Sequence, residues 1–178
     1  MTDFSKFKSD LKAIEDWLSK EYSSLRTGKA TPSILDGVIV DSYGSKMKVN
    51  QVAGVSIEDP KTLRVAPWDK TQIKDIEKAI LDADLGLSVN TDEAGLRVIF
   101  PDLTSERRDA LIKVSKTKLE EARVSLRKER DDTKHSIDEE SSNEDEAFRM
   151  KEEMQKIVDE ENKKLEEMAE AKEKEIQG

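Results

Sequence analysis

The chain has 178 residues, of which 40% are charged and 4% are aromatic, and its formal net charge is −9. Globular proteins carry about 25% charged residues, so this composition favours either partial disorder or long helices with narrow apolar faces. The absence of cysteine excludes disulfides and thiolate metal sites. The length allows one compact domain or two small ones.

The sequence contains no apolar segment approaching the roughly 20 residues that a membrane-spanning helix needs. The first ten residues, MTDFSKFKSD, have neither the apolar core of a signal peptide nor the arginine-rich character of a transit peptide. We therefore expect a soluble, cytoplasmic protein with no membrane partner.

Residues 4–25 carry apolar side chains at steps of three and four, which is the pattern of an amphipathic helix with one narrow apolar face. These side chains are Phe4, Phe7, Leu11, Ile14, Leu18, Tyr22 and Leu25. Gly28 and Pro32 follow the last apolar position, and both residue types are common just beyond the end of a helix. The pattern predicts a first helix that ends near Gly28.

After Pro32 the pattern changes to short β-rich runs separated by turn residues. The runs cover residues 38–40, 55–57, 63–65 and 96–100. A short helix is expected between the third and fourth runs, around residues 71–83, where isoleucines recur at helical spacing. The middle of the chain is therefore predicted to be a small mixed β/α domain.

The helical pattern returns after residue 103. Thr104 is a favourable N-cap residue, and a thin apolar stripe follows it along the chain. The stripe comprises Leu111, Ser115, Leu119, Ala122, Leu126, Thr133 and Ile137. A Ser-Ser-Asn segment at 141–143 predicts a turn, and a last long helix is expected to follow it.

These elements predict an α+β fold, because a helix with a thin apolar face can bury that face only against other helices. Residues 1–28 and 105–178 would form an antiparallel three-helix bundle, with a β/α/β domain at residues 33–100 inserted between its first two helices. The chain would cross between the domains at 29–32 and 101–104, and two short linkers predict a hinge. The expected hinge residues are Ala30, Thr31, Pro32, Leu103 and Thr104.

Gly28 and Lys29 resemble the end of the phosphate-binding loop GxxxxGK[ST]. The motif also requires an earlier glycine, where Ser23 stands, and a serine or threonine after the lysine, where Ala30 stands. It follows a strand, whereas a helix is expected here. We therefore exclude a nucleotide site.

The residues needed for catalysis or metal binding are scarce. His135 is the single histidine, and together with Asp131 and Glu139 it would make a poor metal site. With no cysteine and no second histidine, a nucleophile would lack a base and an orienting group. We expect no catalytic site, no metal and no cofactor, and therefore no enzyme.

The charge is unevenly distributed along the chain. Residues 136–178 carry a net −9, whereas residues 20–31 carry +2 and residues 104–135 carry +3. Within the last of these, four basic residues recur at steps of four, three and four, so they share one side of the expected helix. This basic ridge comprises Arg123, Arg127, Arg130 and Lys134, and Arg107 and Arg108 stand at the start of the same helix.

The basic ridge has two interpretations. Its arginines can pair with carboxylates of the same helix, such as Glu120 and Asp131, at a few tenths of a kcal/mol for each pair. Alternatively they can bind phosphates and stacked bases, for which the planar guanidinium is well suited. Spacing alone leaves both interpretations open.

Five segments resemble, in order and spacing, the signature segments of the ribosome recycling factor family. They are residues 25–30 (LRTGKA), 67–70 (PWDK), 76–80 (IEKAI), 84–87 (DLGL) and 103–108 (LTSERR). The resemblance covers essentially the whole chain. It implies an L-shaped, two-domain protein of tRNA-like outline, with a helical bundle and a smaller domain on a hinge.

The resemblance also implies a function. Members of the family bind the ribosome after termination together with elongation factor G and GTP, and the ribosomal subunits then separate and release mRNA and tRNA. The helical domain lies on large-subunit rRNA, and the smaller domain swings and is engaged by the elongation factor. A monomer without catalytic activity or cofactor is therefore expected.

The resemblance assigns roles to particular positions. Arg26, Lys29, Arg108, Arg127 and Arg130 match the rRNA-contacting residues of the family, and Arg123 joins them as a member of the basic ridge. The chain departs from the family pattern at Asp131, where another arginine is common, and at Ser42, Lys46 and Lys48 around the first predicted turn.

Two other functions are consistent with parts of the sequence. A helical adaptor that holds protein partners would explain the charged composition, but not the five ordered segments. A ribosome-bound relative with a dormancy role would share the segments without splitting ribosomes.

Overall fold

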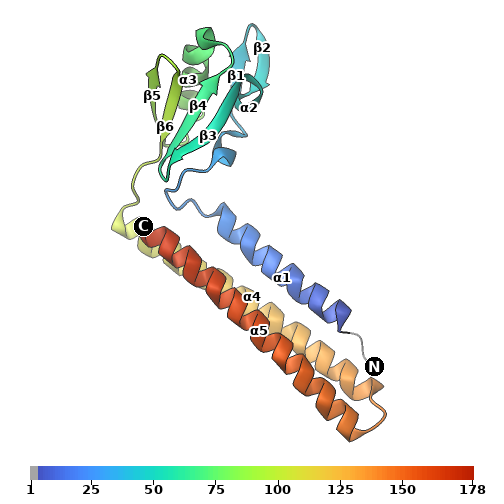
Figure 1. Cartoon of the computed structure of the whole chain (residues 1–178). Coiled ribbons are helices and arrows are strands. Elements are labelled where there is room, and N and C mark those ends of the chain that lie inside the picture. The colour runs from blue at the N-terminus through green and yellow to red at the C-terminus, as the bar shows by residue number, and fades with distance from the viewer. Residues whose placement is uncertain (1–3) are drawn as a thin grey trace. The chain divides into compact units, whose positions relative to one another are not determined.

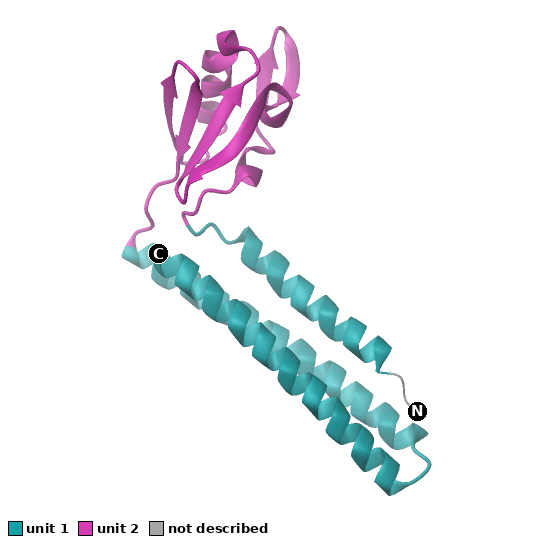
Figure 2. Ribbon diagram, in the orientation of Figure 1, with its two compact units in different colours: residues 1–27, 105–178 teal, residues 28–104 magenta. Residues whose placement is uncertain are grey.

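The computed structural model describes residues 4–178. The chain divides into two compact units, shown in Figure 2. Unit 1 contains the described residues up to Thr27 together with Ser105–Gly178, and unit 2 is Gly28–Thr104. Unit 2 therefore takes in both segments, 29–32 and 101–104, that the sequence assigns to linkers.

Unit 1 consists of three helices: α1 (Ser5–Ser24), α4 (Ser105–Glu140) and α5 (Glu144–Gln177). Consecutive helices of the bundle run antiparallel (Figure 1), which confirms the predicted α+β architecture with a three-helix bundle. The turn at residues 141–143 is also confirmed: Asn143 caps α5 by accepting a hydrogen bond from the Glu146 backbone N–H. None of the described helices is both long and apolar enough to cross a membrane.

The apolar stripes of the three helices meet in one core. Leu11 and Leu18 of α1, Leu126 and Ile137 of α4 and Leu165 of α5 are almost completely buried. One polar contact ties α1 to α4, because the Tyr22 hydroxyl donates a hydrogen bond to the carbonyl oxygen of Ser115 at 3.1 Å. The apolar spacing of three and four residues thus predicts correctly which side of each helix is buried.

Unit 2 contains two antiparallel sheets. The hairpin β1 (Ile39–Ser42) and β2 (Ser45–Lys48) forms one, and the other has the order β3-β4-β6-β5. Its strands are β3 (Ala53–Asp59), β4 (Thr62–Pro67), β5 (Ser88–Asp92) and β6 (Gly95–Ile99). The helices of unit 2 are η1 (Pro32–Leu35), α2 (Val49–Val52), η2 (Lys70–Gln72) and α3 (Ile73–Asp82).

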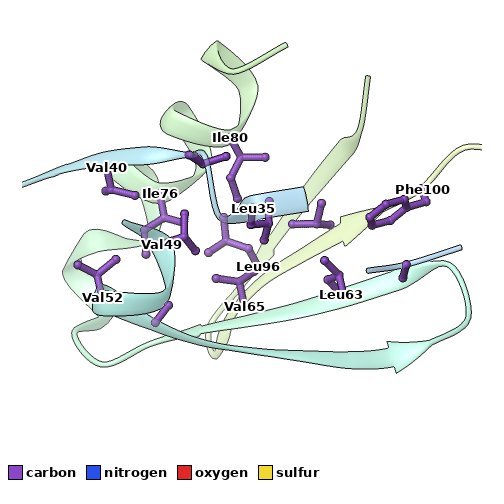
Figure 3. Close-up of a cluster of buried hydrophobic side chains, with 14 residues drawn as sticks. Leu35, Val40, Val49, Val52, Leu63, Val65, Ile76, Ile80, Leu96 and Phe100 are labelled. Atoms are coloured by element: carbon purple, nitrogen blue, oxygen red, sulfur yellow. The ribbon is translucent and has the colours of Figure 1, made fainter. Parts of the chain in front are cut away.

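One cluster of apolar side chains holds unit 2 together, as Figure 3 shows. The central strands β4 and β6 contribute Val65 and Leu96, and α3 contributes Ile76 and Ile80, all with at most 2% of their surface exposed. Because consecutive strand residues point to opposite faces, the other face of the four-stranded sheet carries Arg64 and other polar residues.

The predicted helix at 71–83 is confirmed by η2 and α3, and the four predicted β runs overlap β1, β3, β4 and β6. The sequence does not reveal β2 and β5. Both lie at the edge of a sheet and have no buried residue, so neither shows the apolar alternation that marks a half-buried strand.

Candidate nucleic-acid interface and hinge

The basic ridge lies on α4, and its arginines meet carboxylates in the structure. Arg127 Nη2 lies 2.7 Å from Glu120 Oε1, and Arg130 Nη2 lies 2.7 Å from Asp131 Oδ1. Arg123 reaches across to α5, where its Nη2 lies 3.6 Å from Glu166 Oε1. The hydrogen bond from Arg127 lowers the pKa of Glu120 below its ordinary value.

The two intrahelical pairs are those that the ion-pair interpretation of the ridge expects. They do not exclude phosphate binding, because an exposed ion pair is worth only about 0–1 kcal/mol and a phosphate accepts bidentate hydrogen bonds from arginine as well as a carboxylate does. The side chains of Arg123, Arg127 and Arg130 keep 32%, 51% and 36% of their surface exposed. The ridge is therefore accessible to an anionic partner.

Arg26 and Lys29 follow the end of α1, and both side chains are exposed. Neither forms a salt bridge within residues 4–178. Thr27, between them, is held on α5 because its hydroxyl donates to Glu175 Oε1 at 2.6 Å. Arg26 belongs to unit 1 and Lys29 to unit 2.

Arg108 lies in the first turns of α4 and is half-buried. Its Nε atom is buried and has no hydrogen-bond partner within the described residues. A buried donor without an acceptor costs about 1–3 kcal/mol. Of the six predicted rRNA-binding residues, Arg108 is the one whose local environment leaves a buried donor unsatisfied.

The two predicted linkers are both attached to the turn between β3 and β4. The backbone N–H of Ala30 donates to the Pro60 carbonyl at 2.8 Å, and that of Phe100 donates to the Lys61 carbonyl at 2.8 Å. The Lys61 side chain also forms an ion pair with Asp102. One turn therefore fixes the start and the end of unit 2 together.

The expected hinge residues differ in how firmly they are held. Ala30 is 3% exposed and belongs to the core of unit 2, and Pro32 begins η1. Thr31 between them is exposed and Leu103 is half-buried. Gly28, which precedes the predicted linker, has a φ of +77°, a left-handed conformation that favours glycine.

The described residues contain no group of three or more histidine and acidic side chains that would hold a metal ion. His135 is exposed, and its Nε2 lies 3.3 Å from Glu139 Oε1, one turn away on the same helix. This geometry is that of a surface pair.

The sequence matches the family model described as "Ribosome recycling factor" over residues 18–176. It is similar to proteins named ribosome-recycling factor in several bacteria. The protein from Desulforamulus reducens is 44% identical over 175 residues, covering 97% of this chain and 95% of that protein. The protein from Deinococcus radiodurans is 41% identical over 187 residues, covering 100% of both.

Two solved structures are similar over nearly the whole chain. A solution structure of the ribosome recycling factor has a TM-score of 0.69 and 32% identity, covering 99% of both chains. The second describes the T. thermophilus ribosome recycling factor and the E. coli elongation factor G bound to the E. coli post-termination complex. It has a TM-score of 0.61 and 37% identity, covering 98% of this chain and 97% of the other.

Proposed function

Because this chain belongs to the ribosome recycling factor family, we propose that it binds the ribosome after translation termination and, with elongation factor G and GTP, separates the subunits. The observation that carries the proposal is similarity over nearly the full length of the chain, including similarity to a recycling factor described with elongation factor G on the post-termination complex. In this role the chain is a non-catalytic binding factor, and mRNA and tRNA leave as the subunits part.

Unit 1 is the part that we propose anchors the protein to large-subunit rRNA. The contacts are Arg26, Arg108, Arg123, Arg127 and Arg130 of unit 1, with Lys29 of unit 2 in the first chain crossing. The accessible guanidinium groups on α4 support this assignment, because phosphate contacts supply most of the affinity in electrostatic RNA binding. The acidic residues are concentrated in the chain after residue 135, away from the basic ridge in sequence.

Unit 2 is the part that we propose moves during recycling. Thr27 is held on α5, and Ala30 is held on the β3–β4 turn, so bending in the first crossing falls on Gly28 and Lys29. In the second crossing Asp102 is held by Lys61 and α4 begins at Ser105, so the pivot lies between these two fixed points, where the expected hinge residue Leu103 stands. The proposed pivot therefore leaves out Ala30 and Pro32 of the first expected linker and takes in Gly28, which precedes that linker.

The proposed function is tested by adding purified protein, elongation factor G and GTP to post-termination 70S complexes. Light scattering and sucrose gradients are expected to show conversion into subunits that requires all three components. Stabilised 70S particles would instead support the dormancy role, and unchanged particles would contradict recycling.

The proposal that unit 2 moves has its own experiment. Because the sequence has no cysteine, only introduced cysteines can react with a thiol reagent. One cysteine is introduced on the exposed surface of each unit, and the two are joined by a short bifunctional thiol reagent. The joined protein is expected to bind ribosomes but not to split them, with the unjoined double-cysteine protein as control. Full splitting by the joined form would show that the motion is unnecessary.

A further inference from the structure

Two large aromatic side chains stand exposed on unit 2. Tyr43 is 78% exposed and Trp68 is 73% exposed, the highest values among the large apolar side chains described as exposed. Trp68 belongs to the segment PWDK, one of the five that resemble the family. Neither residue is part of the apolar cluster that holds unit 2 together, so packing of the core does not account for them.

Tyr43 is held in place by neighbouring polar groups. It occupies the turn between β1 and β2 with a φ of 52°. Its hydroxyl donates to the Asp69 carboxylate and lies 3.2 Å from the Thr71 hydroxyl. Asp69 is itself fixed, because it also accepts from the Thr71 backbone N–H at 2.9 Å. The exposed ring of Tyr43 therefore has little freedom to lose on binding.

Trp68 is held by a backbone hydrogen bond and by a contact of its ring. Its backbone N–H donates to the Val52 carbonyl at 3.0 Å. Its ring lies over Gly54, where an added Cβ would meet Trp68 Cη2 at 3.4 Å. Asp69, which follows Trp68 in the chain, accepts the hydrogen bond of the Tyr43 hydroxyl, so one residue links the two aromatic positions. We term Tyr43 and Trp68 the aromatic pair.

The charge of unit 2 indicates which kind of macromolecule the aromatic pair suits. Unit 2 carries nine lysine and arginine residues against twelve aspartate and glutamate residues. A net acidic domain repels the phosphates of RNA. Pre-ordered tyrosine and tryptophan side chains are the typical centres of protein interfaces, because they bury a large area at a small cost in conformational entropy.

We propose that the aromatic pair, Tyr43 and Trp68, anchors a docking surface for a protein partner that offers an apolar pocket with a basic rim. This inference rests on the proposed function, in which the protein that acts together with this chain is elongation factor G. The aromatic pair is then the part of unit 2 that elongation factor G binds.

The test compares a Tyr43→Ser/Trp68→Ser variant with a Leu81→Ser control, which removes another exposed apolar side chain (53% exposed) from the same unit. The aromatic variant is expected to need at least tenfold more elongation factor G for half-maximal splitting, with unchanged affinity for ribosomes in the absence of that factor. The control is expected to behave as the unsubstituted protein. Circular dichroism and thermal unfolding establish that both variants are folded.

Two results would overturn the proposal. One is an unchanged dependence on elongation factor G. The other is an equal loss of affinity for ribosomes alone, which would assign the aromatic pair to RNA or to a ribosomal protein. A Tyr43→Phe variant keeps the ring but removes its hydrogen bonds, so it is expected to need more elongation factor G than the unsubstituted protein and less than the Tyr43→Ser/Trp68→Ser variant.

A second measurement does not depend on splitting. The chain has two tryptophans, Trp17 on α1 and Trp68, so a ¹⁵N-labelled sample gives two indole N–H signals. Adding unlabelled elongation factor G is expected to change the chemical shift of the Trp68 signal and leave the chemical shift of the Trp17 signal in place. If the unsubstituted protein fails to split ribosomes, the proposed function is contradicted, and this titration still decides whether the aromatic pair binds the factor. Two unchanged signals would count against the docking surface.

Discussion

Glu161 is a carboxylate buried within the bundle, only 5% exposed. It lies on α5 between Val158 and Leu165, both part of the apolar core. Its Oε2 accepts a hydrogen bond from Lys164 at 3.1 Å, but its Oε1 is buried without a partner among the described residues. An unsatisfied buried polar atom costs about 1–3 kcal/mol, more when it is charged, so this side chain works against the stability of unit 1.

We therefore predict that Glu161→Leu raises the free energy of unfolding by about 1–3 kcal/mol, because replacing a buried charge by an apolar group of similar volume is often stabilising. Urea unfolding followed by circular dichroism measures the change. The matched control is Glu160→Leu at the exposed neighbouring position, expected to stay within about 0.5 kcal/mol. A less stable Glu161→Leu protein would show that the pairing of the carboxylate with Lys164 outweighs the cost of its unsatisfied oxygen.

Gly28 marks the first chain crossing, and its conformation limits what can replace it. A left-handed backbone costs a residue with a Cβ about 1–2 kcal/mol. A steric clash is not expected, because an added Cβ would lie 3.4 Å from its nearest neighbours, Leu103 Cγ and the Pro101 oxygen. We expect Gly28→Ala to lower stability by about that amount. Gly37→Ala is the control, because Gly37 has neither a positive φ nor an atom within 4 Å of its added Cβ. Equal stability of the two variants would contradict the assigned strain.

At the level of elements, two arginines on the polar face of the four-stranded sheet pair with carboxylates. Arg64 forms a bidentate pair with Asp92 at 2.6 and 2.8 Å, and Arg97 pairs with Glu58 at 2.9 Å. The hydrogen bonds from Arg64, followed by those from the Ala94 and Gly95 backbone N–H groups, hold the pKa of Asp92 far below its usual range. The edge strand β5 is thereby tied to β4 across β6.

The lowered pKa of Asp92 gives a prediction for the pH dependence of stability. A carboxyl group with a depressed folded-state pKa stabilises the fold above its unfolded pKa of about 3.9 and loses that effect as the pH falls toward the folded value. The pKa values of Asp59 and Asp69 are lowered too, by hydrogen bonds from Lys61 and from Tyr43 respectively as the largest causes. We expect the thermal midpoint of unit 2 to be nearly constant from about pH 7 to 5 and to fall below about pH 4.

Asp92→Asn separates the contribution of this one residue. Since an amide does not titrate in this range, the variant is expected to be less stable than the unsubstituted protein at pH 7 and to lose less stability on acidification. If the thermal midpoints of the two proteins fall equally between about pH 5 and 3, other carboxylates dominate the acid transition.

The sequence reveals the helices far better than the sheet edges. Leu11, Leu126 and Leu165 belong to apolar patterns repeated over many turns, so the buried side of each bundle helix follows from spacing. In β2 and β5 the only partly buried apolar residues are Met47 and Val89, and hydrogen bonding to a neighbouring strand leaves no such pattern. These two strands are stabilised by hydrogen bonds to their neighbouring strands, and a local sequence pattern does not reveal such bonds.

For the whole molecule, sequence spacing places the basic ridge on one side of α4 but does not determine its role. The structure supplies the pairs of Arg127 with Glu120 and of Arg130 with Asp131. The fixing of Ala30 by Pro60 could not be predicted, because it joins residues from separate segments through backbone atoms, which carry no sequence signal. The exposure of Trp68 could not be predicted either, since tryptophan is highly buried on average.

The salt dependence of ribosome binding distinguishes the phosphate-binding interpretation of the basic ridge from the ion-pair interpretation. Each arginine that contacts a phosphate displaces counterions, so the logarithm of the affinity falls with the logarithm of salt concentration by about 0.7–0.9 for each contact. We predict that Arg127→Ala/Arg130→Ala weakens binding to 50S subunits and reduces this slope by about 1.4–1.8. The variant is not expected to lose more than about 1–2 kcal/mol of stability, because the two ion pairs that it removes are exposed.

Lys156→Ala/Lys163→Ala is the matched control, since both lysines are exposed on α5, in the acidic part of the chain. Its slope and affinity should equal those of the unsubstituted protein. If instead the two arginines can be removed without changing the slope, the ridge belongs to the ion-pair interpretation, in which Glu120 and Asp131 are the partners of Arg127 and Arg130. Anchoring would then fall to Arg26, Lys29 and Arg108, whose individual alanine variants should each lower the slope by about 0.7–0.9.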